Sequence, residues 1–287
     1  MQLTASAPHG LTGQLRIWLN GRLYEDPDEA TVAGTDHGLV VGGGVFETLK
    51  VTERGAFAVR RHLNRLNRSA AALGLPEPDH GQIHEAISAV IEGRDFPRGK
   101  LRITYTGGRG PLGSEAAYGP PTLIVMLAPV DVSPRLTSVV TAPWTRNEHG
   151  ALAGVKSTSY AENVRGLGYA AKHDASEAIF LNTAGHVCEG TGTNIFVVFG
   201  DIVVTPPLSA GPLAGITREL IIEWSTVEQR DLTLDEAMRA DEVFITSSMR
   251  DVQGVEHWDD QTFGPAHPVT RAVAATFAER SEADLDP

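Results

Sequence analysis

The stretch Gly154-Val155-Lys156-Ser157-Thr158-Ser159-Tyr160 is the part of the sequence from which the fold and the chemistry can be worked out. Small and hydroxyl-bearing residues flank Lys156, and Ser159 and Glu162 have the spacing of a helix capping box. The pattern predicts a helix that begins just after Lys156 and carries apolar residues on one face: Val164, Leu167 and Ala171. Lys156 therefore lies at the mouth of a helix, where a lysine can be enclosed.

Lysine becomes a nucleophile toward carbonyl groups when burial or nearby positive charge lowers its pKa. The chain has only three other lysines, which are Lys50, Lys100 and Lys172. The main biological use of such a lysine is a Schiff base with pyridoxal phosphate, which also needs a carboxylate for its pyridine nitrogen and a phosphate site. A lone lysine is more often a surface residue, so the interpretation depends on these partners.

Candidates for each partner are present. Glu189 ends a predicted strand just before the small-residue loop Gly190-Thr191-Gly192-Thr193, over which a flat ring can approach closely. Arg65, on a predicted helix, is a bidentate phosphate donor. Gly215-Ile216-Thr217 opens another helix, whose free N–H groups and hydroxyl can bind a phosphate. Each feature is by itself more often an ordinary turn, cap or surface charge, but their joint occurrence favours a pyridoxal-phosphate site.

Composition excludes several classes of function. The 287 residues include 24 Lys and Arg against 36 Asp and Glu, so the formal net charge is −12. This charge, without a cluster of basic residues, argues against nucleic acid and anionic lipid as partners. Residues 1–13 show no signal-peptide pattern, and no apolar run approaches the length of a membrane-spanning helix. Because the single Cys188 cannot form an intramolecular disulfide, we expect a cytoplasmic protein.

Hydrophobic periodicity predicts strands and helices in both halves, which is the α+β class. Asn20-Gly21 between two short strands predicts a type I′ hairpin. Further strands are expected at residues 45–51, 56–59, 101–106, 122–129, 178–181, 195–205 and 243–246, and helices up to Gly74 and Gly93, at 217–228, after Thr233 and at 269–280. The proline-flanked residues 130–136 are the expected linker between a small N-terminal domain (1–129) and a larger C-terminal domain (137–287).

Other chemistries have less support. The glycine pattern of residues 108–113 is that of a dinucleotide site, but the short interval before the next strand contains Gly119-Pro120-Pro121 and leaves no room for the crossover helix of a Rossmann unit. His80, His84 and Glu85 can share a helix face, yet the two histidines lack a third ligand and predict no metal site. The sequence has no Gly-x-Ser-x-Gly nucleophile elbow.

Short motifs occur in a fixed order through both halves: Trp18-Leu19-Asn20-Gly21, Asp36-His37-Gly38, Gly44-Val45-Phe46-Glu47, His62-Leu63-Asn64-Arg65-Leu66, the stretch around Lys156, Glu189-Gly190 with Asn194, Gly215-Ile216-Thr217-Arg218 and Thr246-Ser247-Ser248. In these motifs, and over nearly its whole length, the chain resembles the class IV, or fold type IV, pyridoxal-phosphate enzymes. That family includes branched-chain aminotransferase, D-amino acid transaminase and aminodeoxychorismate lyase. The resemblance implies their two-domain fold, a homodimer and a small-molecule amino substrate.

The resemblance also implies roles for individual residues. Lys156 is similar to the family's Schiff-base lysine and proton shuttle, and Glu189 to the acid that pairs with the pyridine nitrogen. Tyr160 is expected to face the phenolic oxygen of pyridoxal phosphate. The remaining expected contacts of this cofactor, most of them to its phosphate, are Arg65, Gly192, Ile216, Thr217, Ser247 and Ser248.

The substrate is less well defined by the sequence. Gly107-Gly108-Arg109-Gly110 resembles a stretch of aminodeoxychorismate lyases, and residues 105–113 lack the Arg-x-His with which D-amino acid transaminases bind a carboxylate. Phe46 also stands where those transaminases carry a tyrosine. We therefore expect a lyase first, a class IV aminotransferase second, and a non-catalytic binding protein last.

Four residues are candidates for substrate contacts. Arg102 and Arg109 can bind a carboxylate, and Phe46 and Trp144 can form pocket walls; each can instead be merely structural. Gly43 differs from the family that the chain resembles, because many of its members have aspartate at this position.

Overall fold

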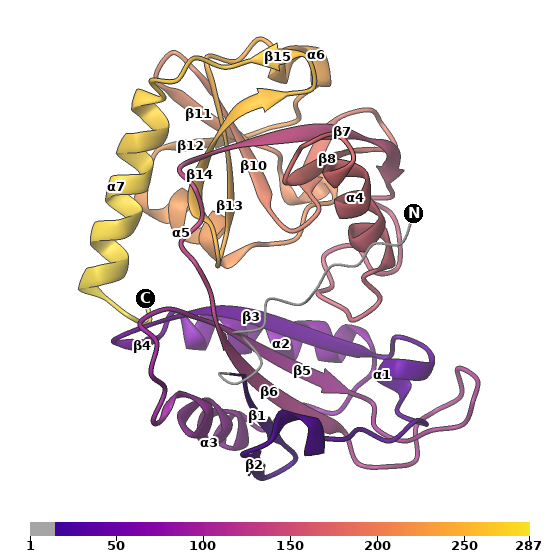
Figure 1. The fold of residues 1–287 in the computed structure, drawn as a ribbon. Coiled ribbons are helices and arrows are strands. Elements are labelled where there is room, and N and C mark those ends of the chain that lie inside the picture. Colours follow the sequence, from indigo (N-terminus) through magenta and orange to yellow (C-terminus); the bar gives the residue numbers. More distant parts are fainter. Residues whose placement is uncertain (1–14) are drawn as a thin grey trace. The chain divides into compact units, whose positions relative to one another are not determined.

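The computed structural model describes residues 15–287, which form two compact units (Figure 1). One unit comprises the described residues up to Asp131, together with Ser157–Ser159 and Asp286. The other comprises Val132–Lys156, Tyr160–Leu285 and Pro287. Residues 1–13, in which the sequence shows no signal-peptide pattern, lie outside the described residues.

The first unit contains a six-stranded antiparallel sheet in the order β2-β1-β6-β5-β3-β4. Asn20 and Gly21 have φ values of 47° and 95°, which confirms the predicted hairpin turn. The strands of this sheet are β1 (Arg16–Leu19), β2 (Arg22–Tyr24), β3 (Gly44–Thr52), β4 (Gly55–Ala56), β5 (Gly99–Thr106) and β6 (Thr122–Pro129).

Two longer helices complete this unit's core. Helix α2 (Val59–Ala72) packs on β3, and α3 (His80–Ile91) packs on β1 and β6. Two shorter elements, η2 (Pro27–Glu29) and α1 (His37–Val40), connect β2 to β3. The predicted helix ends are confirmed, since Gly74 and Gly93 have positive φ just beyond α2 and α3. The strand predicted at 56–59 is shorter, because Ala58 has left-handed φ and α2 begins at Val59.

The second unit contains a nine-stranded sheet in which eight strands follow the order β12-β11-β10-β13-β14-β7-β8-β9, and β15 pairs with β14. Its pairs are antiparallel except β11–β12, β14–β7 and β7–β8. The strands are β7 (Leu136–Arg146), β8 (Glu177–Asn182), β9 (Val187–Gly190), β10 (Asn194–Phe199), β11 (Ile202–Thr205), β12 (Val227–Gln229), β13 (Glu242–Ser247), β14 (Asp251–Trp258) and β15 (Gln261–Thr262).

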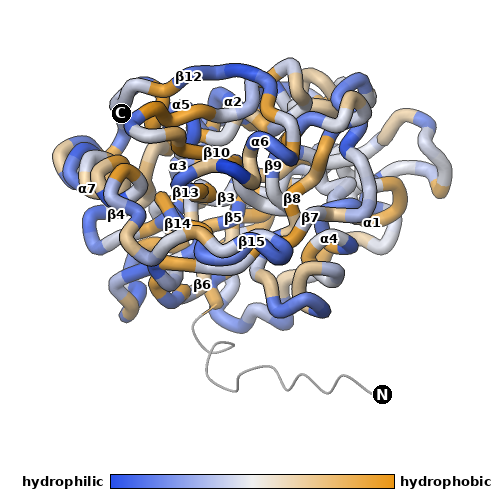
Figure 2. The backbone as a smooth tube through the Cα atoms, turned by 90° about the horizontal axis from the view of Figure 1, so that it is seen from above, coloured by the Kyte–Doolittle hydropathy of each residue, from blue (hydrophilic) through white to orange (hydrophobic). Residues whose placement is uncertain are grey.

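Helices cover this sheet. Helix α4 (Ala161–Ala171) packs on β7 and β8, while α5 (Ile216–Trp224) and α7 (Pro268–Ala283) pack on each other and on β13. Short elements η3 (Leu208–Ala210) and α6 (Leu234–Ala237) lie between strands. Hydrophilic and hydrophobic residues are mixed along α7 (Figure 2), and its buried residues are Thr270, Val273 and Phe277. None of the helices in residues 15–287 has the length and apolar character needed to cross a membrane.

Three sequence predictions in this unit are wrong in detail. The helix predicted at 217–228 ends at Trp224, because Val227–Gln229 join the sheet as a parallel neighbour of β11. Ser159 does not cap α4, since its hydroxyl donates to the Gly42 carbonyl at 3.2 Å. Finally, α4 exposes Val164 and Leu167 and buries another set of residues: Asn163, Gly166 and Ala170.

Candidate active site

Lys156 lies half-buried at the point where the chain leaves the second unit. Its Nζ is 5.9 Å from the centre of the Tyr160 ring. The next three residues, Ser157–Ser159, belong to the first unit, and Tyr160 returns to the second. Within the first unit, the Thr158 amide donates to the Gly44 carbonyl at 2.8 Å, and the Thr158 hydroxyl donates to the Gly42 carbonyl at 2.9 Å. The backbone that follows Lys156 is therefore fixed by hydrogen bonds.

Glu189, on β9, is buried and has two partners in the second unit. Its Oε1 lies 3.3 Å from Arg146 Nη1, and its Oε2 accepts a hydrogen bond from the Leu213 amide at 2.9 Å. Burial raises the pKa of Glu189, while Arg146, the Leu213 amide and Lys156 act in the opposite direction. The residue predicted as the acid partner of a ring nitrogen is thus a buried carboxyl group bound by one cation, Arg146, and one backbone amide.

Arg146, at the end of β7, was not identified from the sequence. Its guanidinium lies 4.5 Å from the centre of the Phe180 ring, and its Nη2 donates to Asn163 Oδ1 at 3.4 Å. These contacts place its charge against Glu189. The one available signal was an arginine that directly follows the strand-like residues 136–145.

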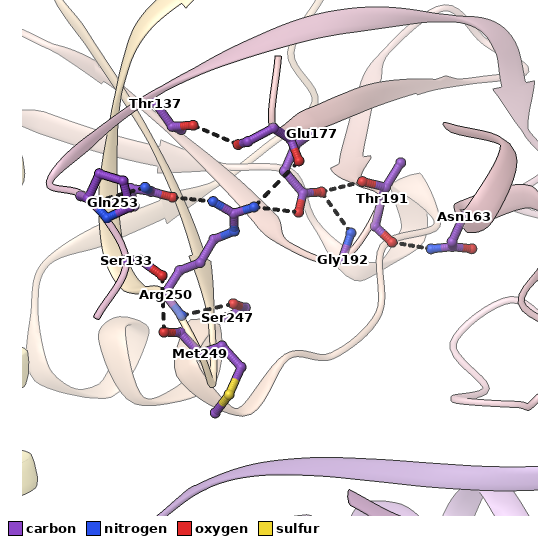
Figure 3. A network of polar contacts seen from close by, with 12 residues as sticks. Ser133, Thr137, Asn163, Glu177, Thr191, Gly192, Ser247, Met249, Arg250 and Gln253 are labelled. Atoms are coloured by element: carbon purple, nitrogen blue, oxygen red, sulfur yellow. Dashed lines mark hydrogen bonds and ion pairs between the residues drawn. The ribbon is translucent and has the colours of Figure 1, made fainter. Parts of the chain in front are cut away.

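The loop after Glu189 is organised by a second carboxylate, Glu177, at the start of β8 (Figure 3). Glu177 Oε2 accepts hydrogen bonds from the Gly192 amide at 2.9 Å and from the Thr191 hydroxyl. Glu177 Oε1 lies 3.2 Å from Arg250 Nη2. Gly192, a predicted cofactor residue, thus donates its amide to Glu177, and a Cβ at Gly192 would meet only Glu177 Oε1 at 3.7 Å.

The same network reaches two further predicted residues. The Tyr160 hydroxyl donates to the Thr191 carbonyl at 3.2 Å, as does the Asn163 side-chain amide at a shorter distance. The Ser247 hydroxyl accepts a hydrogen bond from the Arg250 amide at 3.2 Å, which fixes the turn between β13 and β14 that also carries Ser248. Glu177 and Arg250 therefore join the loop beside Glu189 to this turn (Figure 3).

The start of α5 has the features of a phosphate site. Ile216 and Thr217 form its first turn, and no side chain caps Gly215, the residue before it. A Cβ at Gly215 would lie 2.0 Å from Asn194 Oδ1, so only glycine fits there. In the strand opposite Asn194, the buried Thr246 hydroxyl has no hydrogen-bond partner among residues 15–287. Uncapped amides and an unsatisfied hydroxyl are the donors that a phosphate dianion requires.

Arg65 lies on α2 in the first unit and forms a buried ion pair with Glu47. Arg65 Nε donates to Glu47 Oε1 at 2.8 Å, and Arg65 Nη2 donates to Glu47 Oε2 at 2.6 Å. His62 Nδ1 lies 2.6 Å from the same Oε2. Burial raises the pKa of Glu47, but Arg65 and His62 outweigh it and bring the pKa to about 2. The predicted phosphate donor is therefore held by a fully ionised carboxylate.

Two predicted substrate residues are neighbours in the first unit. The Arg102 guanidinium on β5 lies 3.8 Å from the centre of the Phe46 ring on β3, and Arg102 Nε donates to Thr104 Oγ1 at 3.2 Å. Arg109 lies in the loop between β5 and β6, and its side chain is exposed. These strands are antiparallel neighbours, so the glycine-rich loop joins a hairpin and is not part of a Rossmann unit.

Trp144 and Gly43 are the other two positions singled out above. In the second unit, the Arg165 guanidinium lies 4.1 Å from the centre of the Trp144 ring, and Tyr169 meets that ring edge-on at 5.7 Å. Trp144 thus packs against α4 side chains. A Cβ at Gly43 would make only ordinary contacts, the nearest at 3.4 Å from His37, and nothing in the structure explains the glycine.

A primary amine and a buried carboxyl group in one unit suit acid–base chemistry. Lys156, Glu189 and the uncapped start of α5 all belong to the second unit. Within residues 15–287, no group of three or more His, Cys, Asp or Glu side chains could hold a metal ion.

Comparison with known proteins identifies similar chains. The model of the family described as Amino-transferase class IV matches residues 44–258. A Methanocaldococcus jannaschii protein provisionally named a branched-chain-amino-acid aminotransferase is 31% identical over 250 residues, covering 83% of this chain and 86% of the relative. The "Bifunctional aminodeoxychorismate lyase / D-amino acid transaminase" of Mycobacterium tuberculosis is 29% identical over 295 residues, covering 94% of this chain and 98% of the relative.

A solved structure agrees with both. The PLP-bound form of a hypothetical aminotransferase from Mycobacterium tuberculosis superposes with a TM-score of 0.80 at 27% identity and covers 92% of this chain and 97% of that one. The predicted two-domain fold type IV architecture is therefore confirmed.

Proposed function

Since the chain belongs to the class IV aminotransferase family, we propose that it is an aminodeoxychorismate lyase, which converts 4-amino-4-deoxychorismate to 4-aminobenzoate and pyruvate. Members of this family are transaminases or lyases that depend on pyridoxal phosphate, and this chain is such an enzyme. The observation that carries the lyase proposal is the pairing of Arg102 with the Phe46 ring, followed by the exposed Arg109. An aromatic side chain with two cations suits a cyclic substrate that has one carboxylate on its ring and a second on its enolpyruvyl group.

Two further observations support a lyase over a D-specific transaminase. Pro111 stands where an Arg-x-His pair starting at Arg109 would need histidine, and Phe46 lacks the hydroxyl of a tyrosine. The lyase activity itself is printed in the name of the Mycobacterium tuberculosis relative, beside D-amino acid transamination, so that name supports a lyase without excluding a transaminase.

The described residues fit pyridoxal phosphate. Lys156 supplies the amine, and Glu189 supplies a desolvated carboxylate for the ring nitrogen. The amides of Ile216 and Thr217 and the unsatisfied Thr246 hydroxyl supply donors for the phosphate, with Arg65 as the proposed cation. When bound there, pyridoxal phosphate supplies an electron sink that stabilises negative charge on the amine-bearing carbon of the substrate.

The protein's own groups then act on the substrate. Lys156 Nζ removes the proton from the amine-bearing carbon, and the bond between the neighbouring carbon and the enolpyruvyl oxygen breaks. The ring becomes aromatic, and pyruvate leaves as its enol and takes up a proton. Arg146 and the Leu213 amide keep the Glu189 carboxylate oriented throughout, because both bind it in the resting protein.

The second candidate function is transamination of branched-chain or other amino acids with a keto acid acceptor. It is favoured by the 31% identity to the Methanocaldococcus jannaschii relative. Lys156 Nζ would remove the proton from the α-carbon of the amino acid, and pyridoxal phosphate, when bound, would supply the electron sink and retain the amino group while a keto acid leaves. Under either function, we propose a homodimer, which the family resemblance supports. We also propose a cytoplasmic location, which the single, free Cys188 supports.

One paired assay separates the two functions. In the first arm, 4-amino-4-deoxychorismate is generated enzymatically in place, and 4-aminobenzoate and pyruvate should form over many turnovers without added keto acid. In the second arm, L- and D-amino acids are offered with 2-oxoglutarate or pyruvate. Brisk transamination without any 4-aminobenzoate would falsify the lyase proposal and establish the second candidate.

A further inference from the structure

The motif Asp36-His37-Gly38 has no role in the chemistry above, yet Asp36 has an unusual position in the first unit. Its side chain is 1% exposed. Asp36 Oδ1 accepts hydrogen bonds from the Thr106 hydroxyl at 2.7 Å and the Gly38 amide at 2.8 Å, and Oδ2 accepts one from the Thr122 hydroxyl at 2.6 Å. Such a buried carboxylate is stable only with its oxygens satisfied, and these three donors satisfy it.

The two threonines mark the ends of one loop. Thr106 is the last residue of β5, and Thr122 is the first residue of β6, so Asp36 ties together both ends of the loop of residues 107–121. Backbone bonds continue the connection: the His37 amide donates to the Gly108 carbonyl at 2.8 Å, and the Gly110 amide donates to the Thr35 carbonyl at 3.0 Å. The loop is therefore attached to the motif on both sides of Arg109.

His37 closes over the same part of the loop. It is 6% exposed, and its Nε2 lies 3.0 Å from the Pro111 carbonyl oxygen. A Cβ at Gly110 would lie 1.9 Å from His37 Nε2, and a Cβ at Gly108 would lie 1.9 Å from the Pro120 carbonyl oxygen. Two of the three glycines that mimic a dinucleotide-binding pattern are thus required by packing: Gly110 against His37, and Gly108 against the Pro120 backbone.

Arg109 lies at the centre of the loop that Asp36 and His37 hold. Its carbonyl accepts the amides of Tyr118 and Gly119, both at 3.0 Å, so its backbone is fixed while its side chain is exposed. We propose that Asp36 and His37 are positioning residues that hold the β5–β6 loop so that the Arg109 guanidinium binds a substrate carboxylate. The proposal rests on the proposed function, in which Arg109 has that role. A preorganised loop lowers the entropy lost when the substrate binds.

The test compares Asp36→Asn, Arg109→Ala and the double variant, all loaded with pyridoxal phosphate. We expect Asp36→Asn to raise KM for the amino substrate at least about tenfold, as loss of a charge-assisted contact does, with kcat and cofactor affinity little changed. In Arg109→Ala the KM should rise similarly, and the double variant should be no worse than Arg109→Ala, because Asp36 acts through Arg109. Asp79→Asn, which removes an exposed cap of α3 in the same unit, is the matched control and should leave KM unchanged.

A second readout needs no activity. Leu112 and Tyr118 in the loop are 80% and 71% exposed, so chymotrypsin can cut beside them once the loop backbone is released from its hydrogen bonds. Asp36→Asn should be cleaved there faster than the wild type and faster than Asp79→Asn. If Asp36→Asn does not fold, Thr122→Val removes one of the three donors and should show both effects in weaker form.

The inference is overturned if the KM effects of Asp36→Asn and Arg109→Ala multiply in the double variant, or if Asp36→Asn changes only thermal stability and kcat. It is also overturned if the loop of Asp36→Asn resists chymotrypsin as well as that of the wild type. A wild-type enzyme that turns over neither the chorismate derivative nor any amino acid rejects the proposed function instead, and proteolysis still shows whether Asp36 holds the loop.

Discussion

Arg146 Nη1 lies 3.3 Å from Glu189 Oε1, so the carboxylate proposed to face the cofactor's ring nitrogen has its own cationic partner in the protein. Burial raises the Glu189 pKa, and Arg146 is the largest influence that lowers it. An ionised Glu189 stabilises a protonated ring nitrogen, and a neutral one does not. The ion pair is therefore expected to set the pH range in which the enzyme works.

The first prediction concerns this pH range. In Arg146→Met, the Glu189 pKa rises further. On acidification, kcat/KM should therefore begin to fall at a higher pH in this variant than in the wild type. Glu189→Gln should lose at least about a hundredfold in kcat at every pH, the scale of removing one key electrostatic group. Profiles of kcat/KM against pH measure both effects. The control is Arg280→Met, which removes a different arginine of the second unit, one that lies near the Trp224 ring; it should leave the pH profile unchanged. If the acid limb of the profile does not shift in Arg146→Met, the assignment is contradicted.

The second prediction concerns Lys156. Borohydride reduction of the loaded enzyme, followed by peptide mapping, should place the phosphopyridoxyl label on this lysine. Lys156→Ala should lose the label, the yellow colour and the activity, because its amine is the proposed proton carrier. Lys172→Ala, a change at the end of α4, should keep all three. A label on Lys50, Lys100 or Lys172 in the wild type rejects Lys156.

The third prediction concerns acid stability in the first unit. The Glu47 pKa is about 2 in the folded protein against an ordinary 4.5, so its ionised form stabilises the fold above the ordinary pKa. That contribution, on the order of 3 kcal/mol, is lost as the pH falls through the folded value. Glu47→Gln should be less stable than the wild type at neutral pH, and the difference should shrink between about pH 4.5 and pH 2. Urea unfolding at a series of pH values measures this, with the exposed Glu77→Gln as control; a constant difference across the series is the contrary result.

The fourth prediction concerns the network in Figure 3. Glu177→Gln removes the charge that holds Arg250 and weakens the bonds to Thr191 and Gly192. Pyridoxal-phosphate affinity should fall by roughly tenfold, since this loop and the Ser247 turn lose their common anchor. Titration of the cofactor-free protein gives the dissociation constant. Glu236→Gln breaks the more exposed Arg230–Glu236 pair of the same unit and should have no effect. Equal affinities in Glu177→Gln and the wild type would show that the network serves folding alone.

Local signals explain which parts of the fold could be predicted. The Asn20-Gly21 turn and the glycines that end α2 and α3 are encoded by neighbouring residues, and the structure confirms them. Strand β14, by contrast, mixes polar and apolar residues and carries a register shift between Val255 and His257, so its sequence lacks clean alternation. Its place in the sheet comes from pairing with β13, which precedes it directly in the chain, and with β7 (Leu136–Arg146), which is distant in the sequence.

The candidate site divides in the same way. Lys156 and Glu189 could be proposed because each lies in a run of small residues that is unusual for a charged side chain. Arg146, Glu177 and Arg250 look like ordinary charges beside strands, since only the non-local register of the sheet brings each to a partner. Residues that position others are therefore the ones that local sequence reasoning misses.

The hydrogen bonds of Ser157–Ser159 to Gly42 and Gly44 have a consequence for recombination between relatives. This tripeptide belongs to the first unit. A single crossover near residue 131 would therefore give a chimaera in which Gly42 and Gly44 come from one parent and residues 157–159 from the other. A crossover that also exchanges residues 157–159 would keep the parental pairing on both sides of Lys156. Inherited variation in the two segments is thus expected to be linked, although more than a hundred residues separate them in the chain.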